Sequence, residues 1–270
     1  MALTERSSSL TRYANLFRHV KNPGLFFRNK FSSGISGELI FELGGDVTVA
    51  VPPNRMVEFK CIVLDDCYLK GFRPEAFPND ESMVAVDIGA NLGFFSLYLA
   101  SRFPKARVYA VEPLRVNFDY MVSNLQRNDQ VAVEPVYAAV ASQEGSLTLY
   151  SSTGEDGFPT DGSMISANGD SETYEVSAIP LQSLMEQHDL DRIHFLKVDC
   201  EGAEYDIFYN TPSEVFDRVE LIAMETHAGD GEKENTESIC LRLEEMGFQV
   251  LVAQENTFVW AARDPSLLNR

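Results

Sequence analysis

The sequence predicts an α/β protein in which a mostly parallel sheet carries helices on both faces. Short β-branched runs alternate with helical patterns from Val84 onward, which is typical of βαβ units. In VAVDIGANLGFFSLYLA, residues 84–100, an apolar run leads through a turn with two glycines into a helical pattern. The chain has 270 residues, of which 44% are hydrophobic, and this is enough to bury a substantial core.

The alternation predicts the order of the elements. Strands are expected at residues 83–88, 107–112, 131–140, 194–199, 219–227, 248–253 and 257–262, and helices at 93–102, 114–128, 181–188, 203–209 and 236–246. Residues 1–80 are interpreted as a cap, mainly helical up to residue 40 with a break at Pro23–Gly24, then two short strands and a helical stretch. Residues 81–270 are interpreted as the ligand-binding domain.

One segment, residues 151–172, interrupts the alternation. Its sequence, SSTGEDGFPTDGSMISANGDSE, is rich in Gly, Ser and Asp. A long loop within a compact domain is more often functional than idle, so we expect a lid insertion near the site. A surface loop without function is the alternative.

The charge of the chain bears on its partners. The net charge of −19 argues against a nucleic-acid partner, because most of this surface would repel a polyanion. Residues 1–31 are the exception, with six basic residues and one acidic residue. We interpret this basic arm as a helical cap. A docking arm for an acidic partner and a substrate lid are the alternatives.

The sequence also bears on the location of the chain. No run of about 18 apolar residues predicts a membrane span, and the first 20 residues lack the apolar stretch of a signal peptide. A cytoplasmic location is therefore expected. The cysteines show no CxxC pair and no histidines at zinc-finger spacing, so we expect reduced thiols at Cys61, Cys67, Cys200 and Cys240.

The glycine loop after the first strand of the domain predicts a ligand site. The strand ends at Asp87, and Gly89 and Gly93 follow. Glycine at Gly89 allows a tight turn and the close approach of a ligand, and the helix start that follows favours a polar or anionic group. The spacing is D-x-G-x-x-x-G and not the G-x-G-x-x-G of dinucleotide sites, so an adenosine without phosphates fits better.

A carboxylate at the end of the next strand completes this predicted pocket. Glu112 follows Gly93 by 19 residues, and its carboxylate can accept hydrogen bonds from both hydroxyls of a ribose. Ligands of open α/β sheets bind outside the carboxyl ends of strands, so Gly89 and Glu112 belong to one site. Further cofactor contacts are predicted at Asp87, Ala90, Asn91, Gly93, Phe94, Pro113, Asn117, Ala139 and Asp199.

Three segments together resemble the FkbM-type S-adenosylmethionine-dependent methyltransferases. They are VAVDIGANLGFFSLYLA, VYAVEPLRVNFDYMVSNLQRN and FLKVDCEGAEYDIF, and the resemblance covers residues 84–262. It implies a Rossmann-like, seven-stranded sheet of the class I methyltransferase fold, in the order 3-2-1-4-5-7-6 with an antiparallel last strand. It also implies S-adenosylmethionine as the cofactor and methylation of a hydroxyl on a sugar, polyketide or other natural product.

Acidic residues gather where the fourth strand of that sheet is expected to end. Asp199 ends the strand and Glu201 follows in the turn, and both are predicted to act in catalysis. Glu204 is explained by the favourable place of an acid in a first helical turn. Lys197 lies on the same face of the strand as Asp199, where an ion pair is expected to hold that carboxylate.

The fifth strand, VELIAMETH, supplies the predicted base. Glu225 and His227 are two residues apart, so both are expected to face the cleft beside Asp199. A histidine that is neutral near pH 7 can accept the proton of a hydroxyl during methyl transfer, which makes His227 the predicted general base. Glu225 would orient the imidazole, hold its tautomer or bind the acceptor.

Alternatives to this interpretation stay open. Asp199, Glu201, Glu225 and His227 could instead hold a divalent cation, because such ions prefer oxygen ligands. Other chemistry with the same cofactor, such as N-methylation or cyclisation, is one alternative function, and a non-catalytic binding module is another. The absence of an N-P-P-[YF] signature after the fourth strand favours, by the same resemblance, an oxygen acceptor.

The acceptor is expected to be a small hydroxylated molecule. An acceptor tethered to a carrier protein could dock on the basic arm, because such carriers are usually acidic. The sequence predicts neither the identity of the acceptor nor the oligomeric state.

Overall fold

A computed structural model describes residues 9–31, 37–78, 83–151, 172–229, 231–253 and 257–269. Its centre is a seven-stranded sheet in which β12 is antiparallel to both neighbours and the other adjacent pairs are parallel. Numbered within the domain, this is the order 3-2-1-4-5-7-6, so the predicted fold class is confirmed. From edge to edge the strands are β5 (Ala132–Val136), β4 (Arg107–Val111), β3 (Val84–Ile88), β9 (Ile193–Val198), β10 (Val219–Glu225), β12 (Phe258–Ala262) and β11 (Gln249–Val252).

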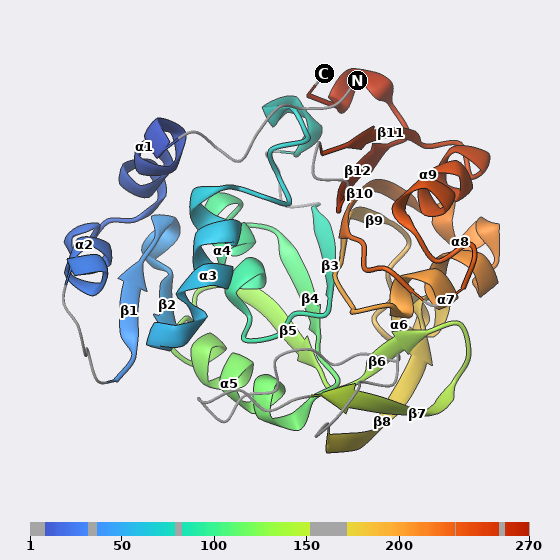
Figure 1. The fold of residues 1–270 in the computed structure, drawn as a ribbon, viewed down its shortest axis with the longest axis horizontal. Helices are drawn as coiled ribbons and strands as arrows, with labels where there is room; N and C mark the ends of the chain where they lie inside the picture. The colour runs from blue at the N-terminus through green and yellow to red at the C-terminus, as the bar shows by residue number, and fades with distance from the viewer. Residues whose placement is uncertain are drawn as a thin grey trace.

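Helices cover both faces of this sheet (Figure 1). Successive strand residues point to opposite faces, so β9 contributes Phe195 to one core and Leu196 to the other. The first core also contains residues of α4 and of the N-terminal region, and the second contains residues of α6 to α9. The helices are α4 (Phe94–Arg102), α5 (Arg115–Leu125), α6 (Leu181–Gln187), α7 (Ala203–Asn210), α8 (Ser213–Phe216) and α9 (Thr236–Glu245).

The N-terminal region packs on the sheet domain through the first core. Leu16, Phe41 and Phe59 from this region are fully buried there. Arg12 of α1 donates two hydrogen bonds to Asp65, which holds the helix against the segment that follows η3. The predicted helices and strands are present: α1 (Ser9–His19), α2 (Gly24–Phe31), β1 (Leu39–Glu42), β2 (Thr48–Val51), α3 (Met56–Phe59) and η3 (Lys60–Leu64), with short 3₁₀ turns at Gly44–Asp46, Pro53–Arg55, Pro74–Ala76 and Pro265–Leu267.

The prediction of a single strand at residues 131–140 is wrong, because this part of the chain forms two strands that belong to different sheets. Within the described residues, β5 is an edge strand with no neighbour beyond it, so the chain is free to leave the sheet at Tyr137. It then forms β6 (Ala139–Ala141), which joins a second sheet in the order β6-β8-β7 with β7 (Gly145–Ser151) and β8 (Glu172–Pro180). This second sheet packs Ala139 and Leu149 in one cluster with Leu114, which follows β4.

The segment predicted as a lid lies almost entirely outside the described residues, since the description stops at Ser151 and resumes at Glu172. These two residues are paired across β7 and β8, so the segment begins and ends on the second sheet. In the described part of the chain, every helix is too short or too polar to cross a membrane.

Candidate active site

The glycine loop follows β3 and turns sharply at the carboxyl edge of the sheet. Gly89 and Gly93 have φ angles of 75° and 81°, a region that favours glycine. A Cβ atom at Gly89 would lie 1.8 Å from the carbonyl oxygen of Asp199. The backbone that follows β9 therefore also requires a glycine here, in addition to the tight turn that the sequence predicts. At Gly93 a Cβ atom would meet the Met121 side chain of α5 at 2.8 Å.

Glu112 connects this loop to the end of β4. Its carboxylate accepts hydrogen bonds from the backbone N–H groups of Asn91 and Leu114, each at 2.9 Å. Burial raises the pKa of Glu112 to about 7, although these two hydrogen bonds favour the ionised form. Asn117, from α5, lies beside it with only 3% of its surface exposed, and its side-chain oxygen has no partner among the described residues.

A first cavity opens at this edge of the sheet, with about 670 Å³ of empty space that includes its open mouth. Its lining joins the glycine loop, the end of β4, the second sheet and the turn after β9. Most of the predicted cofactor contacts lie in its wall: Gly89, Asn91, Glu112, Pro113, Asn117, Ala139 and Asp199.

The other predicted cofactor contacts lie elsewhere. Asp87 is fully buried below the loop, where it accepts a hydrogen bond from Ser96 at 2.6 Å and pairs with Lys197 at 3.0 Å. Its role in this structure is to hold the loop and β9 together. Ala90 and Phe94 line a second cavity, and Gly93 lines neither.

The second cavity has about 780 Å³ of empty space, again with its open mouth included. It shares Gly89, Asn91 and Asp199 with the first. Its other walls come from the 3₁₀ turn before α3, from α3 and η3, from the start of α4 and from the end of β10. Asp199 thus lies where the two cavities meet.

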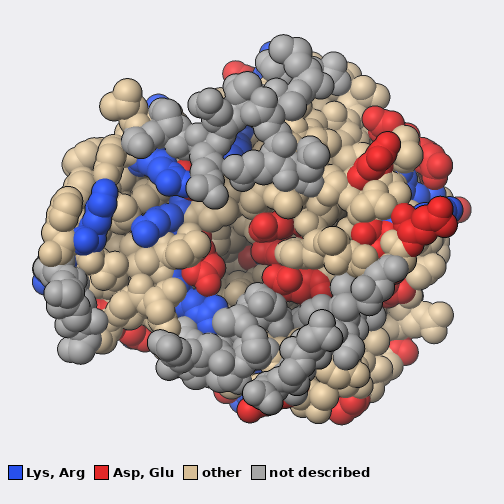
Figure 2. All heavy atoms as spheres, viewed as in Figure 1, with Lys and Arg blue, Asp and Glu red and all other residues tan. Residues whose placement is uncertain are grey.

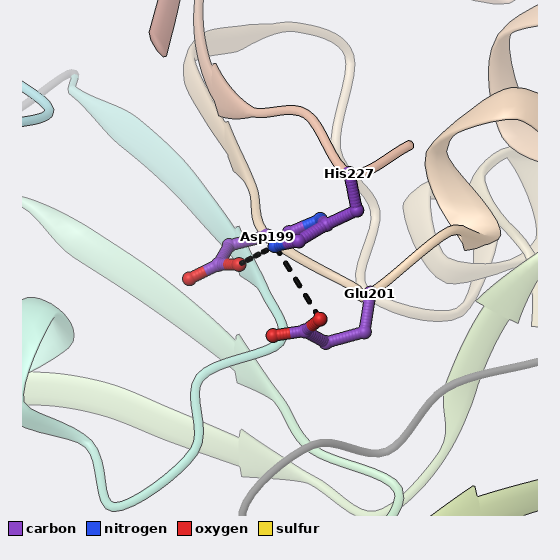
Figure 3. A group of neighbouring side chains, drawn as sticks. All are labelled: Asp199, Glu201 and His227. Carbon is purple, nitrogen blue, oxygen red and sulfur yellow. Dashed lines mark ion pairs between the residues drawn. The ribbon is translucent and has the colours of Figure 1, made fainter. Parts of the chain in front are cut away.

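Three side chains converge at this junction, and Figure 3 shows them facing one another. The Nε2 atom of His227 lies 3.8 Å from a carboxylate oxygen of Asp199 and 3.4 Å from one of Glu201. These three residues, which were expected to face one cleft, are close in the structure. One ligand atom from each lies within 4.8 Å of the other two. Ligands about 2.1 Å from one metal ion are roughly 3–3.5 Å apart, so a cation between them is geometrically allowed.

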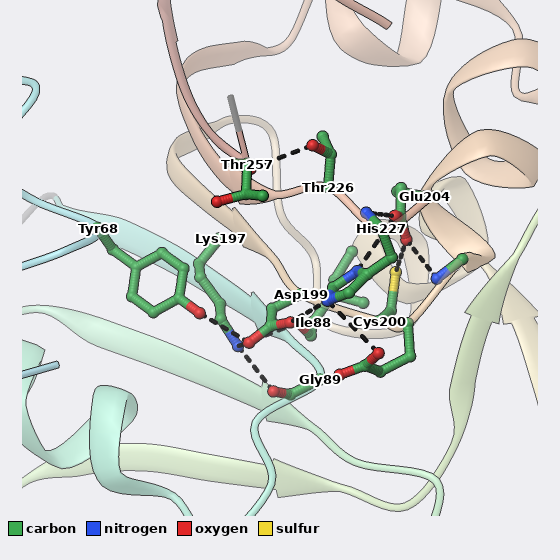
Figure 4. A network of polar contacts seen from close by, with 12 residues as sticks. Tyr68, Ile88, Gly89, Lys197, Asp199, Cys200, Glu204, Thr226, His227 and Thr257 are labelled. Atoms are coloured by element: carbon green, nitrogen blue, oxygen red, sulfur yellow. Dashed lines mark hydrogen bonds and ion pairs between the residues drawn. The ribbon is translucent and has the colours of Figure 1, made fainter. Parts of the chain in front are cut away.

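Glu204 holds the other side of the His227 ring (Figure 4). Its side chain is fully buried, and one carboxylate oxygen accepts the backbone N–H of His227 at 2.8 Å and lies 3.3 Å from Nδ1. The other oxygen accepts the N–H of Gly202 at 2.8 Å. The expected place of Glu204 in the first turn of α7 is confirmed, and the fully buried carboxylate also contacts the ring.

The charge state of His227 also differs from the expectation. Burial alone would lower the pKa of His227, but the hydrogen bond to Glu204 and the charges of Glu201, Glu204 and Asp199 together raise it to about 9. His227 is thus an imidazolium at pH 7 in the protein without ligands.

Glu225 makes none of the described contacts with His227. It lines the second cavity, and burial followed by the charge of Asp199 raises the pKa of Glu225 to about 7. Of the roles predicted for Glu225, contact with the acceptor is the one this position allows.

Asp199 is held from the opposite side by two further residues (Figure 4). Tyr68 donates a hydrogen bond to Asp199 at 2.7 Å, and Lys197 lies 3.7 Å from the same carboxylate oxygen. Lys197 is closer to Asp87 and to the carbonyl oxygen of Gly89, at 3.0 and 2.7 Å, so the expected pair with Asp199 is only one of its contacts.

The contact of Glu204 with the His227 ring was not predicted from the sequence. Nor was the place of Arg55 and Glu58 in the wall of the second cavity. For Glu204 the sequence did offer a signal, because its neighbours are mostly apolar or aromatic: Ala203, Tyr205, Ile207 and Phe208. All four are buried in the structure. The segment of Arg55 and Glu58 offered no comparable signal, because only the tertiary fold places it at the site.

Similarity to known proteins agrees with this geometry. Methyltransferase 1 of Beauveria bassiana (strain ARSEF 2860) is 28% identical over 83% of this chain and 93% of that protein. The 31-O-demethyl-FK506 methyltransferase FkbM of Streptomyces tacrolimicus is 26% identical over 74% of this chain and 84% of that protein. The AMB antimetabolite synthetase AmbE of Pseudomonas aeruginosa is 28% identical over 64% of this chain, a stretch that makes up 10% of the synthetase. The sequence profile of the methyltransferase FkbM domain matches residues 87–250, and this chain therefore belongs to the FkbM methyltransferase family.

Proposed function

We propose that the protein transfers a methyl group from S-adenosylmethionine to a hydroxyl of a small molecule. The observation that carries this proposal is the meeting of two cavities at Asp199, next to an imidazole whose Nε2 atom faces that carboxylate. A donor in one cavity and an acceptor in the other would place the two reacting groups at the junction.

The residues of the first cavity fit the cofactor. Each oxygen of Glu112 accepts one backbone hydrogen bond, and the Asn117 side chain donates a further one. A carboxylate can accept about four hydrogen bonds, so Glu112 can still accept one from a ribose hydroxyl. The side-chain oxygen of Asn117 is buried in the cavity wall and has no partner among the described residues, as expected of a group that awaits a ligand. Ala138, Ala139 and Val140 leave room for a flat ring.

The chain contributes alignment and proton transfer. When bound, S-adenosylmethionine supplies an activated methyl group, so the protein has mainly to place the acceptor oxygen in line with it. Asp199, fixed by Tyr68, would position the acceptor hydroxyl, and His227 would remove its proton through Nε2. A positioned base contributes about 10²–10⁴-fold to such a rate.

The pKa of His227 bears on this role. A base must be neutral, and the pKa of about 9 means that His227 is mostly charged at pH 7 in the free protein. A positive charge bound in the first cavity would lower that pKa, since like charges disfavour the protonated ring. We therefore expect the acidic limb of the pH profile to lie lower in the ternary complex than in the free protein.

A divalent cation held by Asp199, Glu201 and His227 is the competing interpretation of the same cluster. It is favoured by the short distances among the three ligand atoms and by the contact of Nδ1 with Glu204, which resembles the carboxylate–histidine–metal arrangement of many metal sites. In that case His227 would hold the ion and could not act as the base.

The basic arm would suit an acidic carrier protein that delivers the acceptor. The described residues 9–31 contain five basic and no acidic residues, and two of the five are paired, Arg12 with Asp65 and Lys21 with Asp46. Figure 2 shows basic side chains gathered on the side of the molecule where α1 and α2 lie. η3, on which α1 packs, lines the second cavity, so a carrier on this surface would be near its entrance. The likeness to a segment of the synthetase AmbE is compatible with such a setting.

Calorimetric titration tests the proposed cofactor. S-adenosylmethionine and S-adenosylhomocysteine are expected to bind and NAD is not, with equal affinities in the presence and absence of Mg²⁺. A clear gain in affinity with Mg²⁺ would favour the cation interpretation. Binding of NAD alone would contradict the proposal.

A further inference from the structure

We propose that the second cavity binds the methyl acceptor and selects an amino alcohol, that is, an acceptor with an ammonium group beside the hydroxyl. This inference rests on the proposed function, because it assumes that the first cavity takes the methyl donor. It adds the chemical class of the acceptor.

The position of the second cavity suits an acceptor site. It meets the first cavity at Gly89, Asn91 and Asp199, so a molecule bound there can present one hydroxyl to Asp199. Figure 2 shows the face of the molecule hollowed at its centre, with acidic side chains on both sides of the hollow.

The unused polar groups of this cavity are hydrogen-bond acceptors. One carboxylate oxygen of Glu58 and the side-chain oxygen of Asn91 are buried without a hydrogen bond among the described residues. The Glu225 carboxylate makes no hydrogen bond and no ion pair with any other residue that the structure describes. Buried polar atoms without partners are costly, so the oxygens of Glu58 and Asn91 favour a ligand that donates hydrogen bonds, and the half-buried Glu225 adds a further acceptor.

The donors of the same cavity are already engaged. The Tyr68 hydroxyl donates to Asp199, and the Lys197 ammonium donates to the carbonyl oxygen of Gly89. Arg55, which is almost completely buried, donates to the other oxygen of Glu58 at 3.3 Å. A ligand rich in acceptors would have to displace these contacts.

The charge of the cavity favours a cation over an anion. Lys197 is offset by Asp87, and Arg55 by Glu58. The cavity has two further acids, Glu225 and Asp199, and Asp199 also lies near Lys197 and His227. Glu225 and Asp199 both line this cavity, so two acidic side chains face the same space and repel each other. An ammonium group would relieve this repulsion, whereas a carboxylate or phosphate would add to it.

The remaining wall is apolar and suits the carbon skeleton of such an acceptor. Its side chains belong to α3, η3, the glycine loop and α4: Val57, Ile62, Leu92, Phe94 and Phe95. An aliphatic ring or chain could lie against them while its polar groups face Glu225 and Glu58.

Three matched probes test the proposal: the trans isomers of aminocyclohexanol, cyclohexanediol and hydroxycyclohexanecarboxylate with the two groups on neighbouring carbons. Their affinities are measured by calorimetry on the complex with S-adenosylhomocysteine. The amino alcohol is expected to bind at least about tenfold more tightly than the hydroxy acid, with the diol between them. Equal or tighter binding of the hydroxy acid, or no binding of any probe up to tens of millimolar, would overturn the inference.

Variants connect this preference to its residues. Glu225→Gln and Glu58→Gln should each reduce the preference for the amino alcohol by roughly threefold or more, and leave the affinity for S-adenosylhomocysteine unchanged. Glu75→Gln, at an exposed glutamate outside both cavities, is the matched control. A preference that survives both variants contradicts the assignment. Failure of S-adenosylhomocysteine to bind the unaltered protein would instead contradict the proposed function.

Discussion

The two cavities that meet at Asp199 are built from different kinds of sequence. The first is lined by loops that directly follow β3, β4 and β9, and the glycines and acids in those loops stand at fixed spacings. The second is lined in large part by the 3₁₀ turn before α3, by α3 itself and by η3, which lie far from those loops in the sequence. The cofactor side could therefore be recognised from local motifs, whereas the acceptor side exists only after the N-terminal region has packed on the sheet.

The largest effect is expected at the boundary that both cavities share. Gly89→Ala would place a Cβ atom 1.8 Å from the carbonyl oxygen of Asp199, so the backbone after β9 would have to move. We expect the free energy of unfolding to fall by at least about 3 kcal/mol, measured by denaturant titration. Gly24→Ala is the control, because a Cβ atom there meets nothing within 4 Å. Similar small losses in both variants would show that the shared boundary is not rigid.

The next effect separates chemistry from cofactor binding. His227→Ala should lower kcat by about 100-fold or more while the affinity for S-adenosylhomocysteine stays nearly unchanged, since His227 lines neither cavity wall but faces their junction. Steady-state kinetics and calorimetry check the two parts. His188→Ala, outside both cavities, is the matched control. A near-normal kcat in His227→Ala would make the histidine a bystander.

Glu112→Ala should have the opposite effect from His227→Ala, because it should mainly weaken binding of the cofactor in the first cavity. Loss of the carboxylate removes the expected contact with the ribose and two hydrogen bonds that hold the loop, so the affinity for S-adenosylhomocysteine should fall by about tenfold or more. Binding of the acceptor in the second cavity should change little. Calorimetry measures both, and an unchanged cofactor affinity would place the adenosine elsewhere.

The smallest effect concerns the pH dependence of stability. The pKa of His227 in the folded protein, about 9, lies above its ordinary value of 6.5, so the imidazolium contacts stabilise the fold fully below pH 6.5. This contribution is lost as the pH rises to about 9. Glu112 and Glu225, each with a pKa of about 7, complete most of their titration before that.

The melting temperature should therefore decrease between pH 7.5 and 9, and Glu204→Gln should reduce this decrease because it removes the fully buried carboxylate beside Nδ1. Scanning calorimetry across this range checks both statements. The same decrease in Glu204→Gln would mean that the carboxylate does not stabilise the imidazolium.

Much of the fold could be predicted from the sequence, because period-two and helical patterns report which face of each element is buried. The order of the seven strands came from the resemblance and not from the periodicity. The break between β5 and β6 was missed, since an apolar run does not reveal that an edge strand can leave the sheet at Tyr137.

The candidate site, like the fold, could be predicted from the sequence only in part. Asp199, Glu201 and His227 could be placed together because parallel strands end at one edge of a sheet. Their charge state could not be predicted, because the pKa of His227 depends on Glu204, which reaches the ring only through the packing of α7. The second constraint on Gly89 could not be predicted either, since the Asp199 backbone that it approaches lies more than 100 residues later in the chain.

A crystal structure of the complex with S-adenosylhomocysteine would test the central claim most directly. We predict that the adenosine lies in the first cavity, with its ribose hydroxyls on Glu112 and its sulfur facing Asp199. The second cavity should contain no part of the ligand. A complex in which the ligand occupies the second cavity, or binds away from Glu112, would contradict it.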